Sequence, residues 1–581
     1  MTTLDQKRIV IVGGVAGGAG AAARLRRLCE HCEIIILERG PHVSFANCGL
    51  PYLIGGEIED QESLLLHSPA SLRAQLNLDV RIRSEVRCIR RKDQIVTVTE
   101  LDTGREYELP YDALILATGA APVRPSIPGI GRPGHFTLRT IPDTEHLEAW
   151  IKDCWYCRAV VVGGGYVGLE IAEQFERRGL QVAVVEGLPQ VMAPLDPEMA
   201  AWLHDELREN AIDLYLNDPV AAFEEPRPGE TALASIVVLK SGRRIEADVV
   251  VLGLGVRPES HLAREAGLEI GTLGGIRVNQ HLQTSDPRIW AVGDVIEVRD
   301  LVTGAWGFLP LAGPANRQGR VAADNICGRA TTYDGSWGTS ILRLFRLSAG
   351  CTGANEKTLR KAKIPFHQTH LHPNSHAGYY PGPEPIAIKI LFSPGSGKLL
   401  GAQAVGRSGV DKRIDVFATA LKGGLTIDEI VDLELAYAPP FGAAKDPVNM
   451  AGMAAQSVLA GDVHLLHWND LAGLDPAKSL LLDVRRADER ARGFIPGSIH
   501  IPLNELRFRI FELPRDREII LTCQTGQRSY FAFRVLTHHG FRVRNLAGGY
   551  RTWKIAARSA SDSAAEDPTS ADIFSSASAA Y

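Results

Sequence analysis

The sequence lacks the long apolar runs that mark a membrane protein. Nowhere in its 581 residues do about 18 uncharged apolar residues follow one another, so no transmembrane helix is predicted. The opening Met-Thr-Thr-Leu-Asp-Gln-Lys-Arg contains no apolar segment of the signal-peptide kind. The nine cysteines are scattered, which is typical of a reducing compartment and not of a disulfide scaffold. We therefore expect a cytoplasmic protein without a membrane partner.

The sequence also lacks a basic excess. Lys and Arg number 63 against 68 Asp and Glu, and the net charge of -5 offers no overall positive field for nucleic acid. At roughly 100–200 residues per domain, the chain is long enough for three to five domains. Glycine, in contrast, is abundant at 57 residues, which suggests nucleotide-binding loops.

The first nucleotide-binding pattern begins near the start of the chain. The apolar strand 8–12 leads into Gly-Gly-Val-Ala-Gly-Gly and then an alanine-rich helix. Gly13 and Gly18 keep the spacing of a dinucleotide turn, although Val15 replaces the middle glycine. A second strand ends in Glu38, where a carboxylate can bind ribose hydroxyls. The pattern predicts that a pyrophosphate lies at the helix N-terminus.

The same pattern returns at 159–186. This copy has all three glycines, Gly163, Gly165 and Gly168, and its second strand ends in Glu186. Two complete units in one chain predict two bound dinucleotides. A carboxylate at this strand end accepts hydrogen bonds from the free ribose 2′-hydroxyl of NADH and repels the 2′-phosphate of NADPH. No arginine that could bind a 2′-phosphate follows Glu186 directly. The sequence therefore favours NADH over NADPH.

Three further strand ends complete the nucleotide region. Residues 109–119 end in Ala-Thr-Gly, 249–255 end in Gly-Leu-Gly, and 284–294 end in Ala-Val-Gly-Asp. Together with the two glycine units, this arrangement resembles the FAD-dependent pyridine nucleotide–disulfide oxidoreductases. The resemblance implies that Asp294 binds the ribityl chain of the flavin, and that the helix at 314–327 points its N-terminus at the flavin and stabilises negative charge on it.

The resemblance also implies an α/β fold class with two Rossmann-like nucleotide-binding domains, the FAD domain being split by the NAD domain. An α+β dimerisation domain and a further α/β domain follow. The expected boundaries are 1–120 with 255–330 for FAD, 121–254 for NAD(H), 331–455 for dimerisation, 456–465 for a linker, 466–556 for the last domain and 557–581 for a disordered Ser/Ala-rich tail.

Cys48 is the candidate redox centre. It lies in Ser-Phe-Ala-Asn-Cys-Gly-Leu-Pro-Tyr, where the glycine and proline suit a bend from loop into helix, and a helix N-terminus or a nearby cation usually lowers a thiol pKa. The alternative is a small buried hydrophobic residue. The next cysteine is Cys88, so a protein disulfide beside the flavin is not expected. A lone thiolate must form a mixed disulfide, a persulfide or a sulfenic acid.

The run around Cys48, the first glycine loop and the Tyr-Tyr-Pro and Tyr-Ala-Pro-Pro clusters closely resemble the coenzyme A disulfide reductases and NADH-dependent persulfide reductases over residues 1–455. That likeness implies a homodimer in which Cys48 is the nucleophile, and Tyr437 with Tyr379 or Tyr380 of the partner subunit protonates or orients the leaving sulfur. The implied contacts to the thiol arm and the phosphates of coenzyme A are Ser44, Asn47, Arg24, Arg26, Arg27 and Asn316, although the arginines also fit a solvated helix face.

Cofactor contacts are expected at seventeen positions that follow the strand ends and glycine turns. These are Gly13, Val15, Ala16, Gly18, Glu38, Arg39, Thr118, Gly119, Gly163, Gly165, Gly168, Glu186, Gly255, Gly293, Asp294, Pro310 and Ala312. No metal is expected. The pairs Cys29/Cys32 and Cys154/Cys157 have the spacing of zinc or redox cysteines. Because each pair lies on a short segment that leads to a strand, in a different domain, we favour ordinary packing.

The C-terminal region carries a second candidate thiol. Strand 518–522 is followed by Cys-Gln-Thr-Gly-Gln-Arg-Ser and a helix at 529–539, so backbone N–H groups can surround the sulfur of Cys523. Residues 466–556 resemble a rhodanese domain. This likeness implies that Cys523 is a sulfane-sulfur carrier and that Arg528, in the same loop, is a catalytic residue.

The predicted function joins these two thiols. We expect an FAD- and NADH-dependent reductase of persulfides, polysulfides or coenzyme A disulfide, with coenzyme A as substrate or bound ligand. Two alternatives stay open: an NADH oxidase or peroxidase that uses a Cys48 sulfenic acid, and a non-enzymatic redox or sulfur-trafficking sensor.

Overall fold

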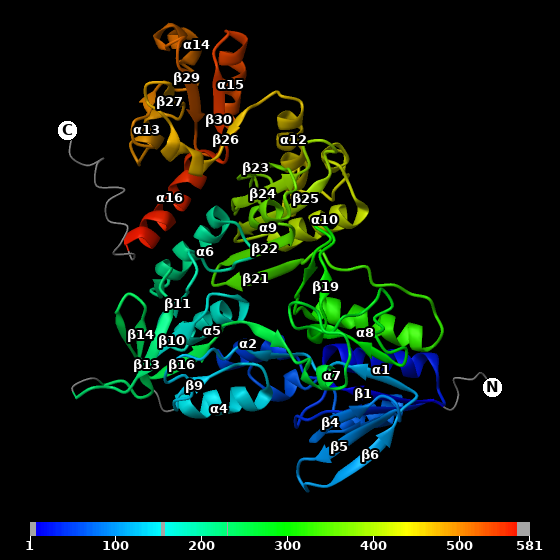
Figure 1. Ribbon diagram of the computed structural model, residues 1–581. Helices are drawn as coiled ribbons and strands as arrows, with labels where there is room; N and C mark the ends of the chain where they lie inside the picture. The colour runs from blue at the N-terminus through cyan, green and yellow to red at the C-terminus, as the bar shows by residue number, and fades with distance from the viewer. Residues whose placement is uncertain (1–6, 153–156, 229–230, 566–581) are drawn as a thin grey trace. The chain divides into compact units, whose positions relative to one another are not determined.

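The computed structural model describes residues 7–152, 157–228 and 231–565. The chain forms two compact units, shown with their elements in Figure 1. The first unit comprises 1–182, 221–238 and 244–336, and the second comprises 183–220, 239–243 and 337–581.

A five-stranded parallel sheet forms the core of the first unit. Its strands, in the order β18-β7-β1-β2-β3, are β18 (Ile289–Ala291), β7 (Ala113–Leu116), β1 (Arg8–Val12), β2 (Glu33–Leu37) and β3 (Asp79–Arg81). Four of these strands come from the beginning of the chain and β18 comes from beyond the second glycine unit. The split sheet predicted from the sequence is therefore confirmed.

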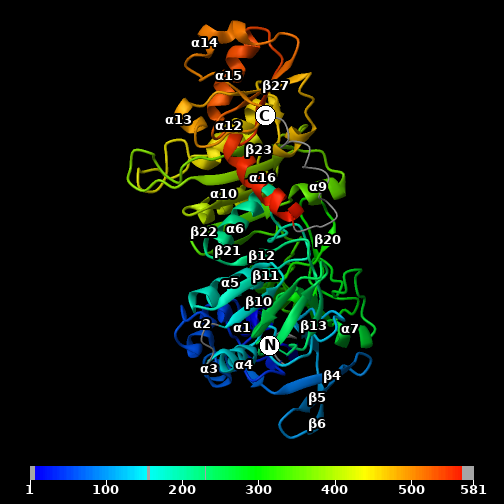
Figure 2. The same cartoon turned by 90° about the vertical axis from the view of Figure 1, so that its left-hand side faces the viewer.

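Helices α1 (Ala16–Leu28) and α8 (Ala312–Ile326) lie side by side in this unit, coloured blue and green in Figure 1. Glycine permits this close approach of the two helices. If Gly319 of α8 had a Cβ atom, that atom would clash with the carbonyl oxygen of Gly17 at 2.4 Å. An antiparallel meander of β4 (Ser84–Arg90), β5 (Ile95–Glu100) and β6 (Glu106–Pro110) also belongs to this unit and is seen at the bottom of Figure 2.

The second glycine turn has its own strands. In the first unit β10 (Arg158–Val162), β16 (Val249–Leu252) and β9 (His135–Phe136) pair in parallel, and α5 (Tyr166–Arg177) follows β10. In the second unit the end of β11 (Gln181–Val185) pairs in parallel with β12 (Asp213–Tyr215), and α6 (Pro197–Glu209) lies between them in sequence. Apolar residues fill these strands, as expected for parallel strands covered on both faces.

The second unit also contains an antiparallel sheet and a parallel one. The antiparallel sheet has the order β21 (Ser340–Leu344), β22 (Leu347–Gly353), β25 (Leu399–Gly406), β24 (Ile386–Phe392) and β23 (His367–Leu371), and its apolar side chains pack with helices α10 (Val410–Gly423) and α12 (Pro447–Leu459). The parallel sheet has the order β26 (Leu465–Leu466), β30 (Val543–Leu546), β29 (Glu518–Thr522), β27 (Ser479–Asp483) and β28 (Ile499–His500).

Two segment predictions need correction. The predicted linker at 456–465 is helical up to Leu459, because α12 continues into it. The predicted disordered tail is wrong for 557–565, since α16 (Gly549–Ala565) runs through this stretch and lies along α6 (Figure 2). His204 Nδ1 is 2.6 Å from Ser559 Oγ, so tertiary contacts stabilise a helix that its Ser/Ala-rich composition alone does not specify. Residues 566–581 lie outside the described residues.

Among the helices of the described ranges, none combines the length and the apolar character that a bilayer span requires.

A buried ammonium group joins the elements of the second unit. Lys389 of β24 is fully buried, and its Nζ lies 2.8 Å from Asp196 Oδ2 and 2.5 Å from Glu198 Oε1 and also contacts Glu356. Burial lowers the pKa of Lys389, but the carboxylates of Glu198, Asp196 and Glu356 raise it above its ordinary value. The three carboxylates are close enough together to hold a metal ion. In this structure the ammonium group of Lys389 supplies the positive charge between them.

Replacing this lysine is expected to destabilise the second unit. In Lys389→Met the buried carboxylates lose their counter-charge, which should cost about 3–5 kcal/mol. Urea unfolding should show an earlier transition, whereas Lys361→Met on the exposed side of α9 (Glu356–Ala362) should leave the midpoint unchanged. Equal midpoints for the two variants would contradict a stabilising role of the buried charge cluster.

Candidate active site

Cys48 lies at the bend predicted from the sequence. It is the middle residue of a 3-10 turn, Asn47–Gly49, that leads directly into helix α2 (Leu50–Ile54), where proline occupies the first turn. The thiol is exposed, and its Sγ lies 3.7 Å from Asn47 Oδ1. Ser44 has a φ of 50°, and its N–H donates to the carbonyl of Gly14 at 2.8 Å. This bond fixes the Cys48 loop against the first glycine turn.

The electrostatic surroundings of Cys48 differ from the expectation. Desolvation raises the pKa of the Cys48 thiol, and the carboxylates of Glu170 and Asp294 raise it further. Tyr52 of α2 donates to Glu170 Oε1 at 3.1 Å, which fixes that carboxylate on α5. Among the residues of this chain, desolvation and two carboxylates therefore shift the thiol pKa in the direction opposite to the one expected from a helix end or a cation.

The first glycine turn fits a dinucleotide. A Cβ on Gly18 would lie 1.9 Å from the carbonyl oxygen of Gly13, so only glycine allows helix α1 to begin so close to β1. The carboxylate of Glu38, at the end of β2, accepts N–H bonds from Gly14 and Gly40, both at 2.8 Å. Its position at the strand end matches that of a ribose-binding carboxylate.

Asp294 fits the expected flavin contact. It lies in a 3-10 turn after β18, Gly293–Val295, and the N–H of Gly293 donates to the buried Gln318 of α8 at 2.7 Å. Burial raises the pKa of Asp294, and Arg139 lowers it. Within the described residues, no side chain donates a hydrogen bond to its carboxylate. A carboxylate of this kind can accept hydrogen bonds from ligand hydroxyls.

The sequence-based prediction missed two charged residues beside the expected cofactor contacts. Arg139 Nη2 donates to the carbonyl of Thr118 at 3.4 Å, and Arg139 Nη1 lies 3.7 Å from Glu259 Oε2. Glu259 also pairs with Arg39 at 2.5 Å and accepts the Thr118 hydroxyl at its carbonyl. Neither residue belongs to a local motif. Their partners are distant in sequence, so the fold alone brings them together.

The remaining cofactor predictions lie on turns and helix ends. Gly163 has a φ of 108°, and a Cβ on Gly168 would lie 2.0 Å from its carbonyl oxygen. A Cβ on Gly165 or Gly255 would meet nothing within 4 Å.

Glu186 belongs to the second unit, where it accepts the N–H of Leu188 at 2.9 Å. Val15 and Ala16 lie where α1 begins, Pro310 and Ala312 lie at the start of α8, and Gly119 has a φ of 73°.

The candidate phosphate-binding arginines differ in their partners. Arg24 pairs with Asp324 Oδ1 of α8 through its Nε at 2.8 Å and its Nη2 at 2.7 Å. Arg26 is buried and donates to backbone carbonyls, among them Leu76 and Asn77, both at 2.9 Å. Arg27 is exposed. Asn316 donates to the carbonyl of Ala312 at 3.0 Å. Of the three arginines, Arg27 presents its guanidinium to solvent, and the phosphate role stays a prediction.

The tyrosine clusters form a pair in the second unit. Tyr379 Oη and Tyr437 Oη are 2.8 Å apart, and both side chains are exposed. The hydrogen bond to Tyr437 raises the pKa of Tyr379. Tyr380 instead packs edge-on against His376, with ring centroids 5.6 Å apart. The geometry therefore groups Tyr379, and not Tyr380, with Tyr437.

Cys523 lies in the loop that the sequence indicated. It is fully buried after β29, and its Sγ accepts the N–H of Gly526 at 3.2 Å and the hydroxyl of Ser529 at 3.3 Å. Helix α15 (Gln527–His538) begins within this loop. Arg528, in its first turn, forms a bidentate ion pair with Glu489, both N–O distances being 2.6 Å. Two donors thus contact the sulfur, and such contacts suit a thiolate or persulfide anion.

The paired cysteines correct another expectation. Cys29 and Cys32 are buried and form a disulfide, so the prediction of ordinary packing is wrong for them. Cys157 is disulfide-bonded as well, and Cys154 lies outside the described residues.

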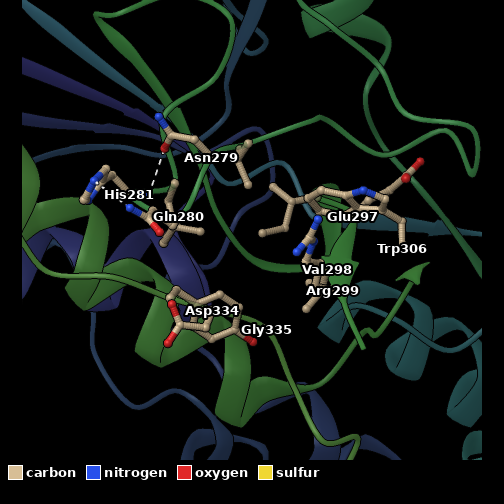
Figure 3. A pocket seen from close by; sticks show the side chains of 13 residues that line it. Asn279, Gln280, His281, Glu297, Val298, Arg299, Trp306, Asp334 and Gly335 are labelled. Carbon is tan, nitrogen blue, oxygen red and sulfur yellow. Dashed lines mark hydrogen bonds between the residues drawn. The ribbon is translucent and has the colours of Figure 1, made fainter. Parts of the chain in front are cut away.

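A cavity of about 480 Å³ lies elsewhere in the first unit. Figure 3 shows Trp306 on one side of it and Asn279, Gln280 and His281 on the other, with Asp334 below. It contains none of the predicted site residues.

The parallel glycine-turn sheets and the exposed thiol define a two-nucleotide oxidoreductase, and comparisons with known proteins agree. The model for pyridine nucleotide-disulphide oxidoreductases matches residues 7–313, and the model for the dimerisation domain of the same family matches 340–447. The chain belongs to the pyridine nucleotide-disulphide oxidoreductase family, whose members use FAD and NAD(H). A rhodanese-like domain matches residues 469–556, so the last resemblance is confirmed.

Individual relatives cover most of the chain. The coenzyme A disulfide reductase of Staphylococcus haemolyticus (strain JCSC1435) is 34% identical over 453 residues, which are 78% of this chain and 100% of the relative. The structure of reduced Bacillus anthracis CoADR-RHD is 47% identical, with a TM-score of 0.92, and covers 95% of this chain and 98% of that one. The NAD-dependent persulfide reductase from A. fulgidus is 36% identical, with a TM-score of 0.88, and covers 94% and 100%.

Gly165 provides a test of the second nucleotide site. Gly165→Ala adds a methyl group that meets no protein atom within 4 Å but projects where the backbone must approach a pyrophosphate. We expect the variant to fold and to retain FAD, with an NADH Kd raised by about tenfold or more in a fluorescence titration. Gly395→Ala, which also meets no atom within 4 Å, is the matched control. An unchanged NADH Kd in Gly165→Ala would remove this turn from the binding site.

Proposed function

We propose that the protein is an FAD- and NADH-dependent reductase of persulfides, polysulfides and coenzyme A disulfide, with Cys48 as its nucleophile and Cys523 as a sulfane-sulfur carrier. The observation that carries this proposal is the pair of free thiols on two different scaffolds. Cys48 lies exposed beside the first glycine turn, and Cys523 lies in a loop lined by hydrogen-bond donors. The relatives named as coenzyme A disulfide reductase and persulfide reductase support the same substrate class.

The exposed position of Cys48 suits attack on an external S–S bond. Its thiolate forms a new S–S bond to one sulfur of the substrate, and the other sulfur leaves with the bonding electrons as thiolate or hydrosulfide. Bound FAD would pass two electrons from NADH to this adduct. This reduction regenerates the Cys48 thiolate and releases the second sulfur of the substrate as a thiolate. Because desolvation, Glu170 and Asp294 raise the thiol pKa, turnover should increase with pH until the thiolate predominates.

Other parts of the proposal concern partners. Glu186 favours NADH over NADPH, and Ser44, Asn47 and Arg27 provide polar contacts for coenzyme A.

The dimerisation-domain match supports a homodimer. The hydrogen-bonded Tyr379 and Tyr437 are proposed to act on Cys48 of the partner subunit by donating to the leaving sulfur. We also propose a cytoplasmic location.

The Cys48 proposal is tested by following NADH consumption and sulfide release together. Coenzyme A disulfide, coenzyme A persulfide and polysulfide serve as substrates. Cys48→Ser should retain yellow FAD but lose about a hundredfold or more of the turnover, because the serine hydroxyl cannot form the mixed disulfide. Cys88→Ser, at another exposed free cysteine of the first unit, should keep its activity. Full activity in Cys48→Ser, or NADH consumption that depends on oxygen alone, would overturn the proposal.

Cys523 should matter for some substrates more than for others. In Cys523→Ser we expect turnover of polysulfide to fall several-fold, while a small coenzyme A persulfide that reaches Cys48 directly is reduced at nearly the normal rate. The ratio of kcat/KM for the two substrates measures this difference. Equal losses on both substrates would contradict a delivery role.

A further inference from the structure

Several arginines near the Cys523 loop pair with carboxylates of the same domain. Arg485 is buried and pairs with Asp483, whose carboxylate also lies 3.3 Å from Arg490. Arg486 pairs with Asp488 at 2.9 Å. Arg528 is bound by Glu489 through both of its terminal nitrogens. The guanidinium groups of Arg485, Arg486, Arg490 and Arg528 are therefore already paired with carboxylates of the chain.

Arg528 is the arginine that belongs to the active-site loop itself. Its hydrogen bond to Glu489 raises the pKa of Arg528, and the nearby charge of Cys523 raises it as well. Arg528 is one residue before Ser529, whose hydroxyl donates to Cys523 Sγ at 3.3 Å, and its charge interacts with that of Cys523. Its guanidinium is therefore a cation that could bind an anionic donor near the sulfur. The two bonds to Glu489 direct that guanidinium to an internal carboxylate instead.

Glu489 is itself held in place. It lies in the short helix α13 (Ala487–Arg490), and its Oε2 accepts the N–H of Arg486 at 3.2 Å. Hydrogen bonds from Arg528 and from the Arg486 backbone lower the pKa of Glu489, although burial opposes this shift. The carboxylate is therefore ionised at neutral pH and keeps Arg528 neutralised.

From this geometry we infer that Glu489 is a positioning residue that sets the sulfur-donor specificity of Cys523: by binding Arg528, it disfavours dianionic inorganic donors and leaves thiol-bound persulfides as the preferred class. The inference rests on the proposed role of Cys523 as sulfur carrier. A dianion such as thiosulfate must bring two negative charges close to a thiolate and to the Glu489 carboxylate. A persulfide brings one negative charge, and its organic part can stay outside the loop.

Both transfers balance in atoms and charge. With a persulfide, the Cys523 thiolate bonds to the outer sulfur, the S–S bond of the donor breaks, and a thiolate leaves with the electron pair. With thiosulfate, the same bond forms and sulfite leaves. In each case Cys523 becomes a persulfide anion. Cyanide, added as acceptor, removes the outer sulfur as thiocyanate and restores the thiolate.

The test compares the two donors on the full-length holoenzyme without NADH. Thiocyanate formation is measured with thiosulfate and with glutathione persulfide as donors, for the wild type, Glu489→Gln and the double variant with Arg528→Gln. Releasing Arg528 in Glu489→Gln should lower the KM for thiosulfate by about tenfold or more, since a charge-assisted bond becomes available to the donor. The kcat/KM for the persulfide should change by no more than about twofold. The double variant should lose the gain for thiosulfate.

Glu518→Gln is the matched control. Glu518 forms a similar two-bond pair with Arg544 at the opposite end of β29, so its removal disturbs an equivalent ion pair away from Cys523. Its KM for thiosulfate should equal that of the wild type. An unchanged or raised thiosulfate KM in Glu489→Gln, or equal losses with both donors, would overturn the specificity role while the carrier role stands. If the wild type transfers no Cys523-dependent sulfur from either donor, the proposed carrier function and this inference both fail.

Discussion

The close approach of a helix start to a strand end is the constraint on which both nucleotide sites depend. In the first turn the missing Cβ of Gly18 leaves room for the Gly13 carbonyl, and in the second turn Gly168 does the same for Gly163. Any larger residue would move the helix away from the sheet and withdraw its N–H groups from the pyrophosphate position. The Cys48 loop depends on the first of these turns, because Ser44 donates to the Gly14 carbonyl.

The two thiols have opposite surroundings, and these match different tasks. Cys48 is exposed. Desolvation and the carboxylates of nearby residues raise the pKa of its thiol and so favour the protonated form. Cys523 is buried but receives an N–H and a hydroxyl at its sulfur. A nucleophile that must meet an external disulfide needs access, whereas a carrier must hold an anionic persulfide for longer. The chain thus separates attack from storage.

Local patterns made most of the fold and both thiols predictable. Strand, glycine turn and helix follow one another within a few residues, and Cys48 and Cys523 lie within short runs that determine their own turns. Contacts between distant segments were not predictable in this way. Arg139 and Glu259 meet beside Thr118 only in the folded sheet, and two carboxylates reach Cys48 from α5 and from the turn after β18. The helical stretch 557–565 was missed because its stability comes from α6 and not from its own composition.

The contacts of the second unit show how the rhodanese-like domain is held. Trp468 donates to Glu198, a carboxylate of the Lys389 cluster, at 3.2 Å, and His372 lies 2.8 Å from the Thr552 hydroxyl. Desolvation lowers the pKa of His372 to about 3, so the imidazole ring that makes this contact is neutral at neutral pH.

The connection between the two domains of this unit is short. Only five residues separate α12 from β26, and Val458 at the end of α12 packs against the apolar cores on both sides. Cys523 therefore belongs to the same packed unit as Tyr379 and Tyr437. Its sulfur is positioned by this packing and not by a freely moving tether.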